Sequence, residues 1–427
     1  MRRDLRGLRL IGLVSVAALV AACSGGSGDG TGPGKDKAQP PAVAITPADG
    51  TGKAKPEQGV TVQATLGELT AVKVQLKGQE VPGALSADKK VWKSAGNLQP
   101  NASYTVEAVA ENDGQTATTT SSFKTLKPSA TFGLESNIPW SGQTVGVGMP
   151  IVLNFDQPVK DRKAVESALS VESEKPNEGA WYWYTDEQVI FRTKEYWDAH
   201  QDIKVTGRFS GVKAAKGVYG MKDFTFKFKV GSSNISTVNA RTHRMVVKID
   251  GKKVRDVGIS AGKATERKYT TTNGIHVTME KKNPEIMISP GIEKGEPGYY
   301  REVVPYAVRI SYSGEYVHSA PWSVGSQGRA NVSHGCVNAP PEFAQWYYNQ
   351  SKWGDIVTVT GTDRELEFDN GYGYWQKSWK DWVVGSAFDK SVSTTPGQPQ
   401  AETQPQAGTP GSTTPAAPST PAESTTP

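Results

Sequence analysis

Alternation of apolar and polar residues is the feature of this sequence that most limits its fold. It occurs in three short runs, at residues 60–64, 72–76 and 104–108. A period of two places the apolar side chains of a strand on one face. Turn-forming residues such as Asn112-Asp113-Gly114 separate the runs. We therefore expect a mainly β protein that begins with a sandwich of short strands over residues 42–128.

The segment 98–104 supports a sandwich in this region. Its sequence, Leu-Gln-Pro-Asn-Ala-Ser-Tyr, is similar to the tyrosine corner of immunoglobulin-like sandwiches. In that motif the hydroxyl of the tyrosine, here Tyr104, bonds to nearby backbone. The resemblance implies that residues 42–128 form an immunoglobulin-like domain.

The sequence of residues 129–231 indicates a second β domain, which we also expect to be immunoglobulin-like. Segments 151–155 and 224–230 are rich in apolar, β-branched and aromatic residues. Trp181 and Trp183 alternate with two tyrosines and could form a carbohydrate platform. Such residues more often fill a core or a domain interface, and we favour that interpretation.

Residues 232–361 predict a third β-rich unit that contains one main helix. Asp250-Gly251 and Ser313-Gly314 each lie between strand-like runs, which is typical of hairpins. Asn338 can cap the helix, because two prolines suited to a first helical turn follow it. Gly354 is expected to end the helix.

The C-terminal sequence indicates a short segment that packs against a folded domain, followed by a disordered tail. Trp375, Trp379 and Trp382 are four and three residues apart, which places them on one face of a helix. We expect this extension, residues 362–390, to dock onto the third unit. Residues 391–427 consist mainly of Thr, Pro, Ser, Gly, Ala and Gln and contain no aromatic residue, so we expect disorder.

The N-terminus has the features of an export signal. Residues 1–9 are basic, and residues 10–22 are apolar but shorter than the ~20 residues that span a membrane. Small residues precede Cys23 and resemble a bacterial lipobox, in which the cysteine carries a diacylglycerol. The alternative is an ordinary signal peptide with a chance cysteine. With a lipobox, residues 1–22 are cleaved and residues 23–41 form a flexible tether.

The net charge argues against a nucleic-acid partner. The whole chain carries a formal +5. Four Arg and one Asp in residues 1–22 supply +3 of that charge, so +2 remains after cleavage. A near-neutral chain lacks the basic surface that nucleic-acid binding requires.

The second cysteine, Cys336, is the best candidate for chemistry. If Cys23 carries a lipid, Cys336 has no partner in a compartment where free thiols tend to be oxidised. It lies in the sequence Ser-His-Gly-Cys, with His334 two residues before it and His318 eighteen residues before it. A cysteine nucleophile needs a base or cation that lowers its pKa from ~8.5, and backbone N–H groups for the oxyanion. Gly335 permits a tight turn that exposes such groups, and the helix expected near Asn338 would place partial positive charge close to the sulfur.

Two other interpretations of this cluster remain open. A lone cysteine is often a buried, inert residue. Cys336, His318 and His334 could instead bind a catalytic zinc ion together with a water molecule. The remaining histidines lack such neighbours, and we interpret them as ordinary surface or packing residues: His200, His243 and His276.

A histidine, a loop and then Ser-His-Gly-Cys resembles the signature of the L,D-transpeptidase catalytic domain, the YkuD-type fold. The likeness covers residues 235–361. The order of lipobox, two immunoglobulin-like domains, catalytic domain and Trp-rich extension resembles the long, multi-domain lipoprotein members of this family. Many members have Arg two residues after the cysteine, whereas the long members share the Asn that stands here as Asn338.

The resemblance implies a role for each residue of the cluster. Cys336 would be the nucleophile and His318 its base, with the backbone carbonyl of Ser319 orienting the imidazole. A further set would bind the substrate: Tyr300, Ser333, His334, Gly335 and Asn338. Tyr300 matches a tyrosine on the loop that covers the donor site.

The resemblance also implies the reaction, the partners and the location. Cys336 would attack a diaminopimelate carbonyl in a peptidoglycan tetrapeptide stem and expel the terminal D-alanine. An amine of a neighbouring stem would then resolve the thioester and form a 3→3 cross-link, without metal or cofactor. Carbapenem β-lactams would inhibit covalently. The enzyme would be lipid-anchored to the extracellular face of the cell membrane and reach into the cell wall. A zinc-dependent wall amidase and a non-catalytic wall-binding protein are the alternatives.

Overall fold

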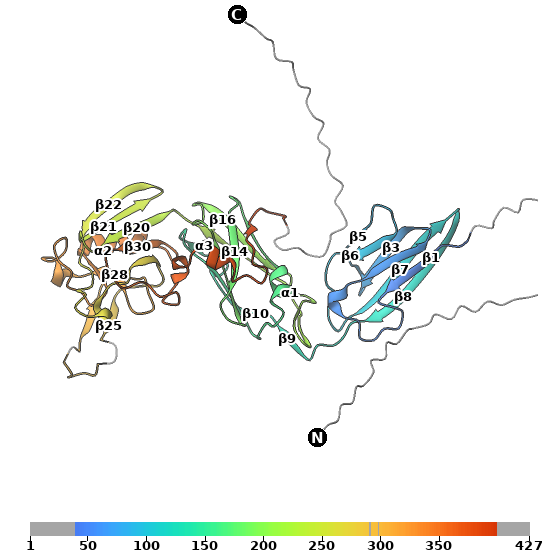
Figure 1. Cartoon of the computed structure of the whole chain (residues 1–427), viewed down its shortest axis with the longest axis horizontal. Helices are drawn as coiled ribbons and strands as arrows, with labels where there is room; N and C mark the ends of the chain where they lie inside the picture. The colour runs from blue at the N-terminus through green and yellow to red at the C-terminus, as the bar shows by residue number, and fades with distance from the viewer. Residues whose placement is uncertain (1–38, 290–291, 298, 399–427) are drawn as a thin grey trace, which may run out of the picture.

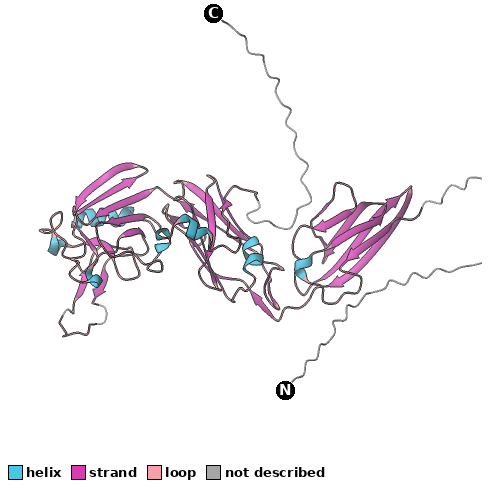
Figure 2. Cartoon of the chain, viewed as in Figure 1, coloured by secondary structure: helices cyan, strands magenta, loops and turns pink. Residues whose placement is uncertain are grey.

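The computed structural model describes residues 39–289, 292–297 and 299–398. Figure 1 shows three β-rich domains in a row, in chain order, with the third domain at the far end from the first. Strands predominate in all three (Figure 2), which confirms the predicted mainly β fold. The predicted signal peptide and Cys23 lie outside the described residues.

The first domain is a sandwich of two four-stranded sheets. One sheet has the order β1 (Ala42–Thr46), β2 (Thr61–Leu66), β6 (Val91–Ser94) and β5 (Gly83–Leu85). The other has the order β4 (Gln79–Glu80), β3 (Glu68–Leu76), β7 (Ser103–Asn112) and β8 (Gln115–Lys124). The hydroxyl of Tyr104 accepts a hydrogen bond from the backbone N–H of Gln99 at 2.7 Å. This bond confirms the predicted tyrosine corner.

The second domain contains two larger sheets and one small one. The five-stranded sheet has the order β10 (Leu134–Ile138), β12 (Ile151–Phe155), β15 (Gln188–Thr193), β14 (Glu178–Trp183) and β31 (Val392–Ser393). The four-stranded sheet has the order β11 (Thr144–Val145), β19 (Phe224–Val230), β16 (Gln201–Gly207) and β13 (Leu169–Ser173). The small sheet has the order β17 (Lys213–Ala215), β18 (Val218–Gly220) and β9 (Ala130–Phe132). Helix α1 spans Arg162–Ser167.

The aromatic pair of the second domain belongs to its core. Trp181 is 1% exposed and Trp183 is 5% exposed. Both pack in one apolar cluster with residues of the two large sheets. The prediction that these residues fill a core is therefore confirmed, and they do not form a carbohydrate platform.

The third domain holds the residues of the predicted site. Its five-stranded sheet has the order β22 (Lys252–Gly258), β21 (Arg244–Ile249), β20 (Asn234–Asn239), β30 (Ile356–Thr360) and β23 (Gly274–Val277). Its four-stranded sheet has the order β24 (Lys281–Lys282), β27 (Ala307–Arg309), β28 (Tyr316–Ser319) and β29 (Val337–Ala339). Strands β25 (Glu285–Ile288) and β26 (Arg301–Val304) form a separate hairpin. Both predicted turns, Asp250-Gly251 and Ser313-Gly314, join antiparallel strands as expected.

Helix α2 (Pro341–Gln350) packs on strand β28 and closes the core of the third domain. The prediction that Asn338 caps this helix is wrong. Asn338 lies within β29, and Pro340 occupies the N-cap position. A proline there has φ near −60°, which suits the entry to a helix without a side-chain cap. Short 3₁₀ turns complete the domains: η1 (Pro56–Gln58), η2 (Arg267–Tyr269), η3 (Pro321–Ser323) and η4 (Gly373–Gln376).

The Trp-rich extension docks mainly onto the second domain, which corrects the prediction. Its three tryptophans lie on η4 and on the short helix α3 (Trp379–Val383) rather than on one continuous helix. All three rings surround the guanidinium of Arg192, at 4.7 to 5.2 Å from the ring centres. The side chain of Gln376 donates to the Ile275 carbonyl of the third domain at 2.8 Å. The extension therefore bridges the second and third domains.

The ordered chain continues beyond residue 390, into the segment expected to be disordered. Strand β31 pairs with β14 at the edge of the second domain. Thr394 is fully buried, and its hydroxyl accepts from the backbone N–H of Asn177 at 2.8 Å. Pairing with an edge strand fixes this segment through backbone hydrogen bonds. Such bonds need no large apolar side chain, so the amino-acid composition gives little indication of them.

Candidate active site

The parallel pairing of β28 and β29 brings the predicted site together. Val317 lies opposite Val337, and His318 lies opposite Asn338. Cys336 immediately precedes β29, so it lies at the end of this ladder beside Tyr316, the first residue of β28. Two segments eighteen residues apart in sequence thus place the thiol and the imidazole at one edge of the sheet.

The turn before Cys336 is held by hydrogen bonds from side chains. Gly335 has φ +132°, a value that residues with a side chain rarely adopt. Its N–H donates to the hydroxyl of Ser333 at 3.1 Å, and that hydroxyl donates to the Cys336 carbonyl at 2.6 Å. The hydroxyl of Thr271 donates to the Gly335 carbonyl at 2.7 Å. Ser333 and Gly335 therefore shape the turn that carries the nucleophile.

The thiol of Cys336 is half-buried and neutral in the free protein. Its sulfur lies 3.6 Å from the carbonyl oxygen of Gly314. Burial, with smaller contributions from the carboxylates of Glu315 and Glu302, raises the pKa of the thiol to about 12, although the backbone N–H of Tyr316 lowers it. We expected from the sequence a thiol whose pKa is lowered. The predicted help from a helix N-terminus is also absent beside the sulfur, because α2 begins only after β29.

His318 is buried and has one ring nitrogen held in place. Its Nδ1 lies 2.9 Å from the carbonyl oxygen of Ser319, the contact expected from the sequence. Burial lowers the pKa of His318 to about 4, against opposing effects of Ser319 and of the Asn338 side chain. The imidazole is therefore neutral at physiological pH. With the Nδ1 proton directed at the carbonyl, Nε2 is the unprotonated nitrogen of the neutral ring and can accept a proton.

His334 and Tyr300 form the rim of the site. Their rings stack with centres 5.2 Å apart and planes at 13°. Tyr269 meets the same histidine edge-on at 4.9 Å, and Nζ of Lys263 lies 3.3 Å from its Nε2. Burial and the charge of Lys263 lower the pKa of His334. Burial, and then the nearby Cys336, raise the pKa of Tyr300.

Asn338 forms hydrogen bonds to two separate segments of the site, at Ser260 and at Ser323. Its backbone exchanges hydrogen bonds with Ser260 in both directions, at 2.9 and 3.0 Å. Its side-chain amide donates to the hydroxyl of Ser323 on η3 at 3.0 Å. The exposed Trp322 on the same turn lies with its ring 6.0 Å from the ring of His318. Asn338 thus fixes the turn that covers the histidine.

Sequence reasoning missed a buried polar cluster behind the catalytic turn. Glu315, Thr272 and His276 are all at most 4% exposed and are hydrogen-bonded to one another. We had interpreted His276 as an ordinary packing residue. Glu315 carried one available signal, since it is a charged residue directly before the strand of His318 in a segment that otherwise predicts burial.

Neither a metal centre nor a membrane span is found in the described part of the chain. Within residues 39–289, 292–297 and 299–398, no three His, Cys, Asp or Glu side chains converge as metal ligands. In the same residues, no helix is long and apolar enough to cross a membrane. The ammonium group of Lys263 lies 3.3 Å from Nε2 of His334, so a metal ion bound through that nitrogen would face a neighbouring positive charge.

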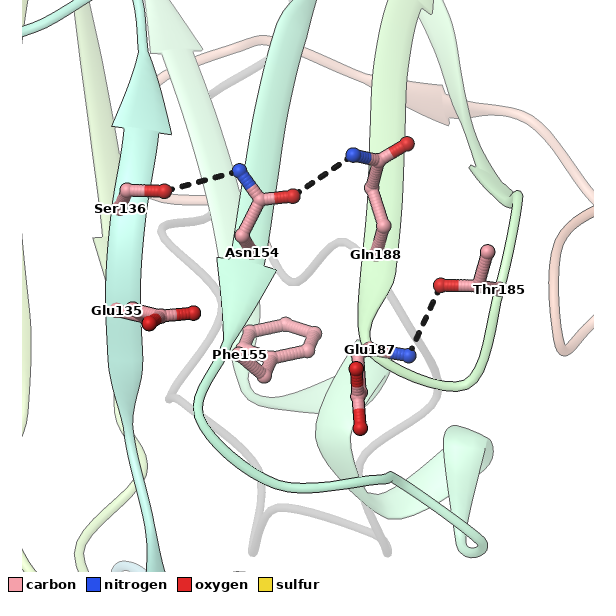
Figure 3. Close-up of a pocket in the computed structure, with 7 residues that line it drawn as sticks. All are labelled: Glu135, Ser136, Asn154, Phe155, Thr185, Glu187 and Gln188. Atoms are coloured by element: carbon pink, nitrogen blue, oxygen red, sulfur yellow. Dashed lines mark hydrogen bonds between the residues drawn. The ribbon is translucent and has the colours of Figure 1, made fainter.

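A separate hollow of about 500 Å³ lies on the second domain. Figure 3 shows its polar side chains on neighbouring strands. Asn154 donates to the hydroxyl of Ser136 at 3.0 Å and accepts from Gln188 at 2.7 Å. These three amide and hydroxyl groups bind one another, and the predicted thiol and imidazole lie in the third domain, so the candidate active site remains the region around Cys336.

Comparison with known proteins agrees with this fold. Residues 233–359 match the L,D-transpeptidase catalytic domain family (YkuD), and residues 51–213 match the bacterial Ig domain family. The second match is one span, whereas the structure divides this region between two sandwiches.

Relatives match nearly the whole chain. L,D-transpeptidase 2 of Mycobacterium tuberculosis is 35% identical over 399 residues, which cover 90% of this chain and 97% of the relative. L,D-transpeptidase 5 of the same species is 33% identical, over 82% of this chain and 79% of the relative. The solved structure of LdtMt1 in complex with imipenem is 34% identical, with a TM-score of 0.46, over 53% of this chain and 99% of that one.

Two immunoglobulin-like sandwiches followed by a YkuD-type catalytic domain define the class of this protein. The chain belongs to the L,D-transpeptidase family. Among named members, it is similar along most of its length to the L,D-transpeptidases 2 and 5 of Mycobacterium tuberculosis.

Proposed function

We propose that this protein forms 3→3 cross-links in peptidoglycan through a thioester on Cys336. The observation that carries the proposal is the placement of a thiol in a glycine turn beside a buried, neutral histidine. Nδ1 of that histidine, His318, is held 2.9 Å from a backbone carbonyl, so Nε2 is the nitrogen that takes up a proton. Family membership supports the same chemistry.

The reaction has two balanced halves. In the first, Nε2 of His318 takes the thiol proton while the sulfur of Cys336 attacks the carbonyl of the diaminopimelate residue in the donor stem. The C–N bond to D-alanine breaks, and the leaving amine receives the proton from His318. In the second, an acceptor amine attacks the thioester, His318 takes its proton, and the sulfur leaves and recovers that proton. No oxidant, metal or cofactor is consumed.

The neutral resting pair determines how the first half proceeds. A thiol with its pKa raised to about 12 and an imidazole with its pKa lowered to about 4 do not exchange a proton at rest. The thiol proton must therefore move to His318 while the sulfur attacks a bound carbonyl. The negative charge then develops on the carbonyl oxygen, which becomes the oxyanion. The backbone N–H of Cys336 is the natural donor to that oxyanion, because the N–H of Gly335 already donates to the hydroxyl of Ser333.

The rim residues would hold the donor stem. Tyr300 and His334 present stacked rings beside the turn, and a peptide stem could lie against them. Ser333 and Asn338 already bind the protein backbone or a neighbouring side chain, so we assign them to holding the shape of the site. Carbapenems would acylate Cys336 in the same way, because their strained ring carbonyl offers the thiol the same kind of electrophile as the donor stem. One relative has been solved in complex with the carbapenem imipenem.

We also propose a location on the extracellular face of the cell membrane. The proposal rests on the lipobox-like residues before Cys23. The two sandwiches would act as spacers that carry the catalytic domain from the membrane into the wall. Replacing Cys23 with Ala should release the protein from the membrane fraction. Unchanged membrane association of this variant, together with an unmodified Cys23 in the wild type, would contradict the anchor.

Product analysis tests the proposed reaction. The purified protein is incubated with disaccharide tetrapeptides, and the muropeptides are separated and sequenced by mass spectrometry. We expect dimers with a 3→3 bond and release of D-alanine, with and without a chelator. Sensitivity to the chelator with cleavage of the stem from the glycan would instead indicate a zinc amidase. Wall binding with no product would indicate a non-catalytic binding protein.

A further inference from the structure

A buried carboxylate lies directly behind the catalytic turn. One oxygen of Glu315 accepts from the backbone N–H of Thr272 at 2.7 Å, and the other accepts from the Thr272 hydroxyl at 2.5 Å. That hydroxyl oxygen also lies 2.7 Å from Nε2 of His276, and the ring lies 3.6 Å from the carboxylate. Burying a carboxylate is costly unless it is paired and hydrogen-bonded, so this cluster holds its members firmly.

The side chain of Glu315 lies close to the turn. A Cβ placed on Gly335 would lie 3.8 Å from Cγ of Glu315 and 4.0 Å from its Oε1. The carboxyl group is therefore a neighbour of the residue whose unusual φ shapes the turn.

The residues on either side of Glu315 both touch the sulfur of Cys336. The carbonyl oxygen of Gly314 lies 3.6 Å from it, and the backbone N–H of Tyr316 faces it. Anchoring the side chain of Glu315 therefore fixes the segment that surrounds the nucleophilic sulfur.

Thr272 extends the same anchoring to the other side of the turn. Its two bonds to Glu315 fix the backbone next to Thr271, whose hydroxyl donates to the Gly335 carbonyl at 2.7 Å. In a trans peptide the carbonyl and the following N–H point in opposite directions. Holding the Gly335 carbonyl therefore aims the N–H of Cys336 away from Thr271, in one fixed direction.

We propose that Glu315 is a positioning residue for the reaction: held by Thr272 and His276, it fixes the turn that carries Cys336 and the backbone groups around the sulfur. The inference rests on the proposed function only in taking Cys336 as the nucleophile. The charge of Glu315 also contributes to the raised pKa of the thiol, so its removal has a second, electrostatic signature.

Two variants of the full chain separate geometry from charge. Glu315→Ala removes both anchors of Thr272, and we expect the rate constant for acylation by imipenem to fall about 10- to 100-fold. Glu315→Gln keeps an acceptor for the Thr272 N–H and should recover most of that rate. Because both variants remove the carboxylate, iodoacetamide should alkylate Cys336 about three to ten times faster at pH 9 than in the wild type.

Glu166→Gln is the matched control. Glu166 is a buried carboxylate of the second domain that also accepts from a ring N–H, a hydroxyl and a backbone N–H, of Trp183, Ser386 and Ala387. Its replacement should lower thermal stability and leave the alkylation profile of Cys336 unchanged.

If Glu315→Ala folds and is acylated at the wild-type rate, the proposal is wrong. If that variant does not fold, Thr272→Val decides in its place, because it removes the hydroxyl that anchors Glu315, and acylation of that variant at the wild-type rate overturns the proposal. Alkylation requires no wall substrate, so failure here is distinguishable from failure to form 3→3 products.

Discussion

Nδ1 of His318 lies 2.9 Å from the carbonyl oxygen of its own neighbour, Ser319. Because the Nδ1–H donor and the carbonyl acceptor belong to adjacent residues, the tautomer of the imidazole is fixed without a carboxylate partner. The imidazole therefore gains no negative neighbour that would stabilise its charged form, and burial lowers its pKa to about 4. This relationship makes the histidine a neutral base rather than half of an ion pair.

The alkylation of Cys336 should reveal this neutral resting state. With the pKa of the thiol raised to about 12, the thiolate fraction increases tenfold for each pH unit through the neutral range. We expect the iodoacetamide rate to rise steadily to pH 10 and beyond. A plateau between pH 5 and pH 8 would instead reveal a thiolate–imidazolium pair and contradict the account.

His318 and His334 should differ in their effect on acylation. His318→Asn removes the base, and we expect acylation by imipenem to slow about 10²- to 10⁴-fold. The steady rise of iodoacetamide alkylation with pH should remain, because the lost imidazole is neutral at rest. His334→Asn should have a smaller effect on acylation, since that ring stacks on Tyr300 at the rim. A larger loss in His334→Asn than in His318→Asn would reverse the assigned roles.

Arg192 should contribute more to stability than a typical surface arginine. Its guanidinium lies against three tryptophan rings and donates to the carbonyl of Lys377 at 2.9 Å. Arg192→Met should lower the free energy of unfolding by about 2–3 kcal/mol. Arg162 faces Trp183 at 5.3 Å but is more exposed and pairs with Asp186, so Arg162→Met should cost less than ~1 kcal/mol. If chemical denaturation shows that Arg192→Met and Arg162→Met lose the same free energy of unfolding, the role given to the three tryptophans is refuted.

Two truncations test where the ordered chain ends. Ending the protein at residue 398 should leave the melting temperature unchanged, because the removed sequence lacks core-forming residues. Ending it at residue 390 also removes β31 and Thr394, whose backbone and hydroxyl bond to Ser173 and Asn177. We expect that loss to lower the melting temperature by about 4–8 °C. Identical melting curves for the two truncations would show that β31 does not contribute.

Asp355 should make stability depend on pH where the second and third domains meet. It is buried against Gly146 of the second domain, and burial raises its pKa to about 7. The folded protein therefore holds a proton that the unfolded chain releases above about pH 4. The contribution of Asp355 to the free energy of unfolding should decline as pH rises from about 4 to 7 and stay constant above. Asp355→Asn should abolish this decline.

Asp250 is the matched control for that titration. It lies in the same region, but the backbone N–H of Ser233 lowers its pKa. Its contribution should be present at neutral pH and lost only as the solution becomes more acidic than about pH 4. Parallel stability curves for the wild type and Asp355→Asn between pH 4 and pH 7 would show that Asp355 does not titrate as described.

Local features of the sequence predicted much of the fold and the core of the candidate site. The hairpin at Asp250-Gly251 and the corner at Tyr104 depend on residues close in sequence, so a pattern reveals them. The placement of Cys336 and His318 at the paired strands β28 and β29 was predictable because the motif spans only eighteen residues and resembles a known family.

The remaining features depend on burial and on partners far apart in sequence. Thr272 and Glu315 are 43 residues apart, and nothing in either segment indicates that the other is its partner. The Trp-rich extension was assigned to the wrong domain because Arg192 lies 185 residues before its partner Lys377. The sequence also suggested a reactive thiol, whereas burial, Glu315 and Glu302 raise its pKa against the lowering effect of the Tyr316 N–H, and only the assembled structure brings these groups near.

The central claim is that Cys336 becomes acylated by the donor stem. The most direct measurement is the intact mass of the protein after brief mixing with a disaccharide tetrapeptide, followed by peptide mapping of the adduct. We predict one added acyl group, equal in mass to the donor less D-alanine, attached to Cys336 and absent in Cys336→Ala. Formation of 3→3 dimers by Cys336→Ala, or an adduct on another residue, would contradict the account.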